Sequence, residues 1–490
     1  MLKLKFTQSA IIFSVVFASA GCASMPPLPS LEGGGTRYLA AAPGGFDKPV
    51  TDLSRWWEGF NDPFLTYYVA LALQQNLDLE QATARIDQAR AQLAGANSAL
   101  LPRGDVNGQA ATLRQSNETA IGQIARTFPG YDRDIESYEA NLAVGWELDL
   151  FGSQRRRRDA ARAEYTAARA SAAATHLAIS AQVAETYVNI RGLQTRLGIT
   201  RKQVDIQRRL LEIVRLQNSK GVAADLQVSQ AETALAQVEA LLPEQSAALE
   251  QAMNALDVLL ASTPGTHRAE LDTDTPIPAA PGLANVGAPG DLLRRRPDLV
   301  VAEQKLMASR ARIGVAVAEY YPKVSLTGLL GTAAIDSGNL FTGSAAQGQG
   351  VLGLRWRLFD FGRVDAEVDA SKGAYAEALA SYRLSVLRAT EDVENALSAM
   401  NHASQRAALL ERGEDASARA SKASLAAYEG GATSLIEVLD ADTRLLNMRD
   451  AFAQARASKA LAAIASFKAL GGGWNRIDLE DGRGATTGNQ

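Results

Sequence analysis

The chain has 490 residues, of which 47% are hydrophobic and 6% aromatic, and its formal net charge is −4 at pH 7. An acidic balance creates no field that attracts nucleic acid, so we expect no nucleic-acid partner. Three histidines and one cysteine are too few for a metal site or a Cys/His nucleophile pair. We therefore expect no enzyme and no bound metal or cofactor.

Residues 1–21 have the layout of a lipoprotein signal peptide. Lys3 and Lys5 precede an apolar run, 10–18, that is too short to span a bilayer. The only cysteine, Cys22, follows Ala-Gly, as at the end of a lipobox. We predict cleavage before Cys22 and its modification with N-acyl and S-diacylglycerol lipid. An ordinary signal peptide with a chance cysteine is the alternative.

A lipidated tether is expected to follow, because segment 22–60 is rich in Pro and Gly. Ala and Ser, and not Asp, directly follow Cys22, which by resemblance to lipoprotein sorting signals favours the outer membrane. We predict a protein that is lipid-anchored in the outer membrane, with outer-membrane lipid as a partner.

The remainder of the chain is a tandem repeat. Segment 146–152 (WELDLFG) matches 356–362 (WRLFDFG) at an offset of 210 residues, whereas Pro102 matches Pro322 at an offset of 220. The difference places a ten-residue insertion in the first copy, between Pro102 and Trp146. The predicted parts are a first repeat (61–270), a linker (271–288), a second repeat (289–470) and a tail (471–490).

Each copy contains the same elements in the same order. A helix, about 63–100 or 290–319, precedes two strands, and two long helices follow. The strand signal is a period of two, clearest in 139–150, where apolar and polar residues alternate as in transmembrane barrel strands. Hairpins on a soluble core are the alternative. The predicted strands are about 102–115, 139–150, 322–331 and 351–360.

Long helices are predicted after each pair of strands. No proline occurs after Pro322, and another stretch of more than a hundred residues between Pro129 and Pro243 lacks it. The segment from Tyr375 to Met400 has apolar or small residues at alternating spacings of four and three, which is a heptad seam. A helix over 153–218 would be about 100 Å long.

The strand count predicts an oligomer. An open four-stranded sheet would leave edges that a bilayer cannot satisfy. A dimer would give eight strands with a filled interior, whereas a trimer gives twelve with a lumen. We expect a trimer, and larger rings remain open. The fold class is therefore mainly α with a β-barrel part.

Two segments carry a family resemblance. Segments 292–303 (LLRRRPDLVVAE) and 321–328 (YPKVSLTG) are similar to the signature of TolC-like outer-membrane factors, most closely their lipoprotein, NodT-type branch. The resemblance implies a homotrimer with a twelve-stranded barrel and an α-helical periplasmic tunnel. It also implies a passive exit duct that receives small toxic compounds or metal ions from an inner-membrane RND-type pump through a periplasmic adaptor.

The resemblance also implies a gate. The long helices would reverse at Gly221 and Gly431 to form the periplasmic tip, and Glu437 and Asp440 would ring its constriction. Repelling carboxylates there would attract cations and hold back anions. Two solvated helix charges are the alternative, and Asp442 is expected on a neighbouring face.

Two other functions remain open on the sequence alone. One is a lipid-anchored duct for type I protein secretion, which shares the architecture. The other is a coiled-coil adaptor lipoprotein that never enters the membrane, and the amphipathic strands argue against it.

Overall fold

The computed structural model describes residues 53–273, 275–282 and 295–474. The predicted signal peptide 1–21, Cys22 and most of the tether 22–60 lie outside them, as does the tail 471–490 beyond residue 474. Parts of the linker 271–288 and of the second repeat's start at 289 are likewise not described. The described chain is mainly helical with one small antiparallel sheet, which confirms the expected helices and strands, whereas the barrel formed by three copies stays a prediction.

The helices and strands follow the predicted order twice. The first repeat contains α1 (Pro63–Gln75), α2 (Leu77–Ser98), β1 (Arg103–Arg114), α3 (Ala120–Ala125), β2 (Asp134–Leu148), α4 (Ser153–Ser219), α5 (Asp225–Glu239) and α6 (Leu241–Leu259). A 3-10 helix, η1 (Leu53–Phe60), precedes it, and α7 (Arg268–Leu271) follows it. The second repeat contains α9 (Pro297–Val317), β3 (Lys323–Ala334), β4 (Ala346–Arg355), α10 (Arg363–Glu429) and α11 (Leu435–Ala469).

The four strands form one sheet in the order β1-β2-β3-β4, with every neighbouring pair antiparallel. Arg103 lies opposite Gly145 in the first hairpin, and Lys323 lies opposite Arg355 in the second. These pairs are related by the two sequence offsets, 220 and 210, so the hairpins have the same register. The ten additional residues of the first copy therefore lie in the loop that contains α3.

Two strands begin and end earlier than the sequence analysis predicted. The second was expected over 139–150 but spans Asp134–Leu148, and the fourth was expected over 351–360 but spans Ala346–Arg355. The C-terminal ends were wrong because Asp149 and Asp360 turn to cap the following helices. The N-terminal ends were missed because pairing with neighbouring strands extends the ladders beyond the apolar alternation.

The second long helix of the first repeat is broken, whereas α11 in the second repeat is continuous. The first is divided at Ala240 into α5 and α6. Pro243 lies just beyond the break, and its ring nitrogen has no hydrogen to donate to the preceding turn. The two copies therefore differ where the sequence has a proline in only one of them.

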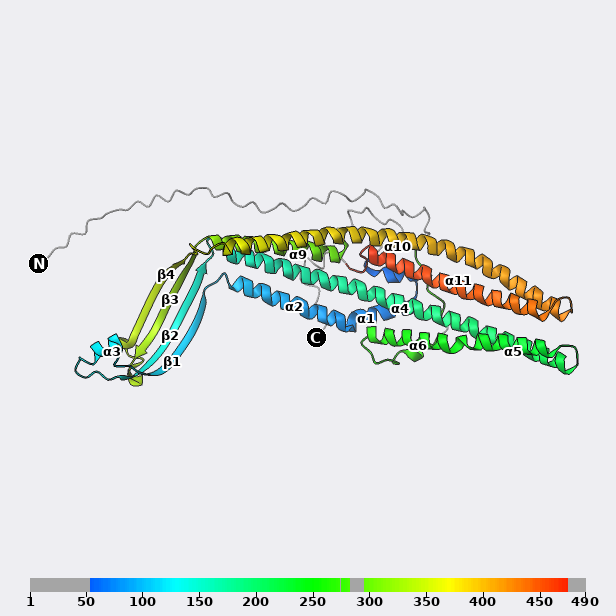
Figure 1. The fold of residues 1–490 in the computed structure, drawn as a ribbon, viewed down its shortest axis with the longest axis horizontal. Helices are drawn as coiled ribbons and strands as arrows, with labels where there is room; N and C mark the ends of the chain where they lie inside the picture. The colour runs from blue at the N-terminus through cyan, green and yellow to red at the C-terminus, as the bar shows by residue number, and fades with distance from the viewer. Residues whose placement is uncertain (1–52, 274, 283–294, 475–490) are drawn as a thin grey trace. The chain divides into compact units, whose positions relative to one another are not determined.

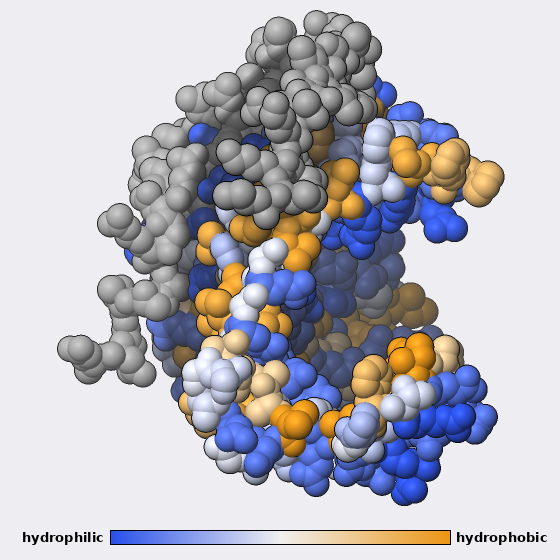
Figure 2. Space-filling model, turned by 90° about the vertical axis from the view of Figure 1, so that its left-hand side faces the viewer, coloured by the Kyte–Doolittle hydropathy of each residue, from blue (hydrophilic) through white to orange (hydrophobic). Residues whose placement is uncertain are grey.

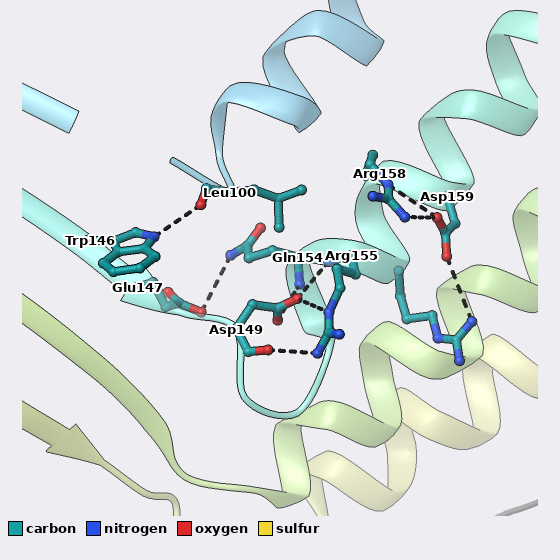
Figure 3. A network of polar contacts seen from close by, with 9 residues as sticks. Leu100, Trp146, Glu147, Asp149, Gln154, Arg155, Arg158 and Asp159 are labelled. Carbon is teal, nitrogen blue, oxygen red and sulfur yellow. Dashed lines mark hydrogen bonds and ion pairs between the residues drawn. The ribbon is translucent and has the colours of Figure 1, made fainter. Parts of the chain in front are cut away.

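The strand-to-helix junction of the first repeat is held by one carboxylate and one indole (Figure 3). Asp149 accepts hydrogen bonds from the backbone amides of Gln154 and Arg155, each at 2.9 Å, and its Oδ2 lies 3.0 Å from the Arg155 Nε. Trp146 Nε1 donates to the Leu100 carbonyl at 3.0 Å. In the second repeat, the equivalent Trp356 Nε1 donates to the Tyr320 carbonyl, also at 3.0 Å. The junction thus repeats in both copies.

The largest core lies midway along the helices, where η1, α1, α4, α6 and α11 meet. Trp56 stacks on Phe467 with ring centroids 5.4 Å apart. Arg191 is fully buried, and its guanidinium donates to the Tyr187 hydroxyl and to the carbonyls of Leu271 and Thr273. This cluster fixes the middle of α4 against the residues that connect the two repeats.

The predicted heptad seam of α10 is confirmed. Tyr375, Tyr382, Val393 and Met400 are buried, and Tyr375 and Tyr382 pack against Leu306 and Ile313 of α9. Within the described ranges, no helix is long and apolar enough to cross a membrane.

Candidate functional site

The predicted tip consists of two equivalent helix turns, at the end of the long helices opposite the sheet (Figure 1). Gly221 and Gly431 both have φ of +72°, a conformation that favours glycine. In each turn the next amide reaches back five residues, from Val222 to the Gln217 carbonyl at 2.9 Å and from Ala432 to Ala427 at 2.8 Å. This is the Schellman pattern, which ends a helix and starts a tight reversal.

The two turns are joined to each other within one chain. The Tyr428 hydroxyl donates to Gln217 Oε1 at 2.8 Å, across from α10 to α4. Beneath this bond, Leu210 and Val214 of α4 pack against Leu435 and Val438 of α11. A hydrogen bond and a small apolar core therefore connect the two hairpins at the tip.

The two predicted gate carboxylates lie on exposed positions at the start of α11. Glu437 lies in the first turn, where the partial positive charge of the helix N-terminus favours a carboxylate. Asp440 lies three residues further, on the same face, and forms an ion pair with Arg444 at 2.8 Å. The sequence analysis missed Arg444, although its spacing of four residues from Asp440 is that of a helical ion pair. The assignment of a gate to these two residues stays a prediction.

A third carboxylate, Asp442, is buried instead of exposed. Its side chain is 6% exposed, and Oδ1 accepts a hydrogen bond of 2.7 Å from the Ser421 hydroxyl on α10. Gln207 of α4 donates to Oδ2 at 3.5 Å. Burial raises the pKa of Asp442 because it disfavours the charged form, and this outweighs the Ser421 hydrogen bond and the charge of Arg449.

The signal for this burial is present in the sequence. The buried positions of α11 begin Leu435, Val438, Asp442 and Leu445, spaced three, four and three. Asp442 therefore occupies a heptad seam position, which explains why it lies away from the face of Glu437. In the first repeat, Gln227 caps the start of α5, because its Oε1 accepts a hydrogen bond from the Ala224 amide at 3.1 Å.

Ion pairs link the long helices along their length. Arg208 and Arg215 of α4 contact Glu239 and Glu232 of α5, each at 2.7 Å. Arg449 of α11 contacts Glu414 of α10 at 3.0 Å. Exposed pairs of this kind contribute little stability, so the apolar seams carry more of it. Among the described residues, no group of three or more His, Cys, Asp or Glu could hold a metal ion.

The sheet at the other end has one apolar and one polar face. Leu142, Val144, Leu330, Leu352 and Leu354 lie on one face and are exposed to the surroundings of the chain. Such a row is unusual on a surface that faces water. Figure 2 views this end, where apolar and polar side chains surround a hollow.

The opposite face of the sheet carries a polar row. Asn141 is buried and lies opposite Gly331, which lies opposite Gln347 on the next strand. The amide of Gln347 donates to Asn141 Oδ1 at 2.8 Å, and Asn141 Nδ2 donates to Glu139 at 3.1 Å. A Cβ on residue 331 would approach Asn141 Oδ1 to 2.4 Å, so only glycine lets the Asn141 side chain cross to β4.

Comparisons with known proteins agree with this architecture. The family model described as "Outer membrane efflux protein" matches residues 68–262 and 288–472, which is one match for each repeat. The chain is 30% identical over 429 residues to Nodulation protein T of Rhizobium leguminosarum bv. trifolii, which covers 86% of this chain and 88% of that protein.

Two further matches are a second relative in sequence and a solved structure. The chain is 30% identical to the pyoverdine export outer membrane protein OpmQ of Pseudomonas putida, covering 89% of this chain and 92% of that one. It resembles the solved structure of the outer-membrane channel OprN with a TM-score of 0.84 at 31% identity, covering 92% of this chain and all of that one. With both repeats matched, the chain belongs to the outer membrane efflux protein family.

Proposed function

We propose that the chain is one third of the outer-membrane exit duct of a tripartite efflux system. Three copies would close their four-stranded sheets into one twelve-stranded barrel, and their long helices would continue it as a periplasmic tunnel. The carrying observation is the sheet, which has an exposed apolar face, a polar face and two edge strands, β1 and β4. Closure removes both edges and directs the polar face to a lumen.

The duct is a passive conduit and not an enzyme, in keeping with the family to which the chain belongs. An inner-membrane RND-type pump would supply the energy, and a periplasmic adaptor would connect the pump to the tip. OpmQ is named for pyoverdine export. We propose that the cargo here is likewise small, a toxic compound or a metal ion. The pump, and not the duct, would make most of the selective contacts with it.

The test is deletion of the protein from its host, followed by complementation. We expect increased sensitivity to a set of small toxic compounds, restored by the intact chain. Secretion of proteins into the medium should remain unchanged, which distinguishes efflux from type I secretion. Unchanged sensitivity together with a secretion defect would overturn the proposal.

We also propose that the duct carries N-acyl and S-diacylglycerol lipid on Cys22, which lies outside the described residues. The support is the charged and apolar segment before Cys22 and its being the only cysteine. Palmitate labelling should be lost in Cys22→Ala. Label retained on that variant would show that Cys22 is not the modified residue.

A further inference from the structure

A polar layer interrupts the apolar contacts between α4 and α11. Toward the middle of the helices, Leu197 of α4 belongs to the largest core, and toward the tip, Leu210 belongs to the small apolar core. Between these two residues, the buried positions of α4 include Thr200, Gln203 and Gln207, each at most 3% exposed. Their spacing of three and four residues is that of a heptad seam. Polar side chains therefore occupy seam positions that are apolar on either side.

Asp442 of α11 completes this layer. The Ser421 hydroxyl donates to its Oδ1 at 2.7 Å, and the Gln207 amide contacts its Oδ2 at 3.5 Å. Two buried amide atoms, Gln203 Nε2 and Gln207 Oε1, have no hydrogen-bond partner among the described residues. Both an unpartnered polar atom and a buried carboxylate oppose close packing. The layer therefore weakens the contact between α11 and α4.

The equivalent carboxylate of the first repeat is not buried. The offset of 210 maps Asp442 onto Glu232 of α5, which is exposed and forms an ion pair with Arg215 of α4 at 2.7 Å. Glu239, also on α5, pairs with Arg208 of α4 at the same distance. The carboxylates of α5 are thus solvated and paired, and the burial of Asp442 is a property of the second repeat alone.

The charges around Asp442 do not offset its burial. Arg449, seven residues further along α11, favours the charged form, but Glu414 of α10 binds its guanidinium at 3.0 Å. Arg208 of α4 and Lys422 of α10 each follow a hydrogen-bond partner of Asp442 in the sequence, and both are exposed to solvent. Burial therefore outweighs these groups and raises the pKa of Asp442.

We propose that the polar layer is a proton-operated latch between α4 and α11. With a proton taken up from water, Asp442 keeps the Ser421 hydrogen bond and donates to the Gln207 amide oxygen, once that amide exchanges the positions of its oxygen and nitrogen. When the proton returns to water, a carboxylate remains in the seam, and the layer loosens to admit water. The latch is closed in acid and opens as the pH rises. It lies within one chain and so goes beyond the proposed duct, whose tunnel it would stiffen near the tip in acidic surroundings.

Infrared difference spectra of the full chain over a series of pH values test whether Asp442 holds the proton. A protonated carboxyl group absorbs apart from carboxylates, and we expect one such band to titrate above the ordinary range for aspartate. Asp442→Asn should remove this band. Gln207→Met, which keeps the length of the side chain, should shift the band to higher frequency because the carboxyl group loses its acceptor. Glu232→Gln, at the equivalent exposed position, is the matched control and should leave the band unchanged.

Hydrogen exchange of the α4 amides around Gln207 tests whether the proton holds the two helices together. At pH 7, exchange should be at least several-fold slower in Asp442→Asn than in the parent chain, and in acid the two should be equal. Gln207→Met should exchange faster than the parent in acid, whereas Glu232→Gln should match the parent throughout. A carboxyl band that survives in Asp442→Asn, or an exchange ratio that does not change with pH, would overturn the latch. Either result leaves the proposed duct intact, because deletion and complementation test the duct separately.

Discussion

Asp149 and Asp360 cap the two long helices although they stand one position apart in the two repeats. Asp149 maps onto Phe359 by the offset of 210, yet Asp360 accepts from the backbone amides of Gly362 at 3.2 Å and Val364 at 2.9 Å. Asp149 accepts from Gln154 and Arg155. The loop after each strand thus adjusts by one residue to bring a carboxylate to the equivalent helix end, beside the strands of the sheet.

We expect Asp149→Ala to lower the free energy of unfolding by about 1 kcal/mol, the usual contribution of a helix cap. Partial burial opposes ionisation of Asp149, but the two amide hydrogen bonds and the Arg155 guanidinium outweigh it and lower its pKa. A lowered pKa in the folded state means that the stabilisation is present above the ordinary value, near 3.8, and is lost as the pH falls through the folded value. Thermal unfolding followed by circular dichroism at pH 7 measures the loss. Asp369→Ala is the control, because Asp369 is exposed and pairs with the exposed Lys372 at 3.1 Å; equal losses in both variants would contradict the capping role.

Arg296 explains part of the Arg-Arg-Pro-Asp segment. Its guanidinium contacts Asp298 at 2.7 Å and Asp392 of α10 at 2.9 Å, and donates to the Ala469 carbonyl at the end of α11. We expect Arg296→Lys to cost on the order of 1–3 kcal/mol, since an ammonium cannot make the forked contacts of a guanidinium. Thermal unfolding checks the cost. Arg268→Lys is the matched control, because Arg268 is exposed and reaches Glu250 only at 3.6 Å; a loss as large in the control would show that the fork at Arg296 is dispensable.

The periodic parts of the fold could be predicted from the sequence, because they depend on local spacing. Local spacing shows which face of a helix or strand is apolar. The apolar face of the heptad seam through Tyr375 and Met400 and that of the strand around Trp146 both occur as expected. The ends of β2 and β4 could not be predicted, because they depend on partners far away in the chain and on which carboxylate turns to cap a helix.

The candidate site was predictable to the same extent. The turn glycines follow from the need for a left-handed residue, and both are found in that conformation. The pairing of Asp440 with Arg444 and the burial of Asp442 required knowledge of which helix face meets α4 and α10. A family resemblance identifies positions, whereas the neighbours of each side chain decide its charge.

Asp442→Asn should stabilise the tip at neutral pH. The raised pKa of Asp442 means that its contribution is most favourable below the ordinary value, near 3.8, and is lost as the pH rises through the folded value. An amide avoids the cost of burying a charge and can still accept from Ser421 and pair with Gln207. Hydrogen exchange of α11 near residue 442 should be slower in the variant at pH 7, with the difference vanishing under acidic conditions.

The matched comparison is Asp450→Asn on the same helix, where the carboxylate pairs with Arg196 and is part exposed. This change should weaken the contact between α11 and α4 at pH 7, opposite in sign to Asp442→Asn. Faster exchange in both variants would show that Asp442 stabilises the tip as a carboxylate, contrary to the expectation from its burial.

Glu437→Gln should reduce cation selectivity in planar bilayers more than Asp440→Asn. Both residues are exposed at the start of α11, but Arg444 forms an ion pair with Asp440 at 2.8 Å, whereas Glu437 lies in the first turn beside the helix N-terminus. In a ring of three copies, the unneutralised carboxylates would set most of the potential in the constriction. Removing Arg444 with Arg444→Gln should therefore increase cation selectivity, because it restores the full charge of Asp440. Glu391→Gln, an exposed carboxylate in the middle of α10, is the control and should leave selectivity unchanged. If all four variants conduct like the parent chain, Glu437 and Asp440 are solvated helix charges and the constriction lies elsewhere.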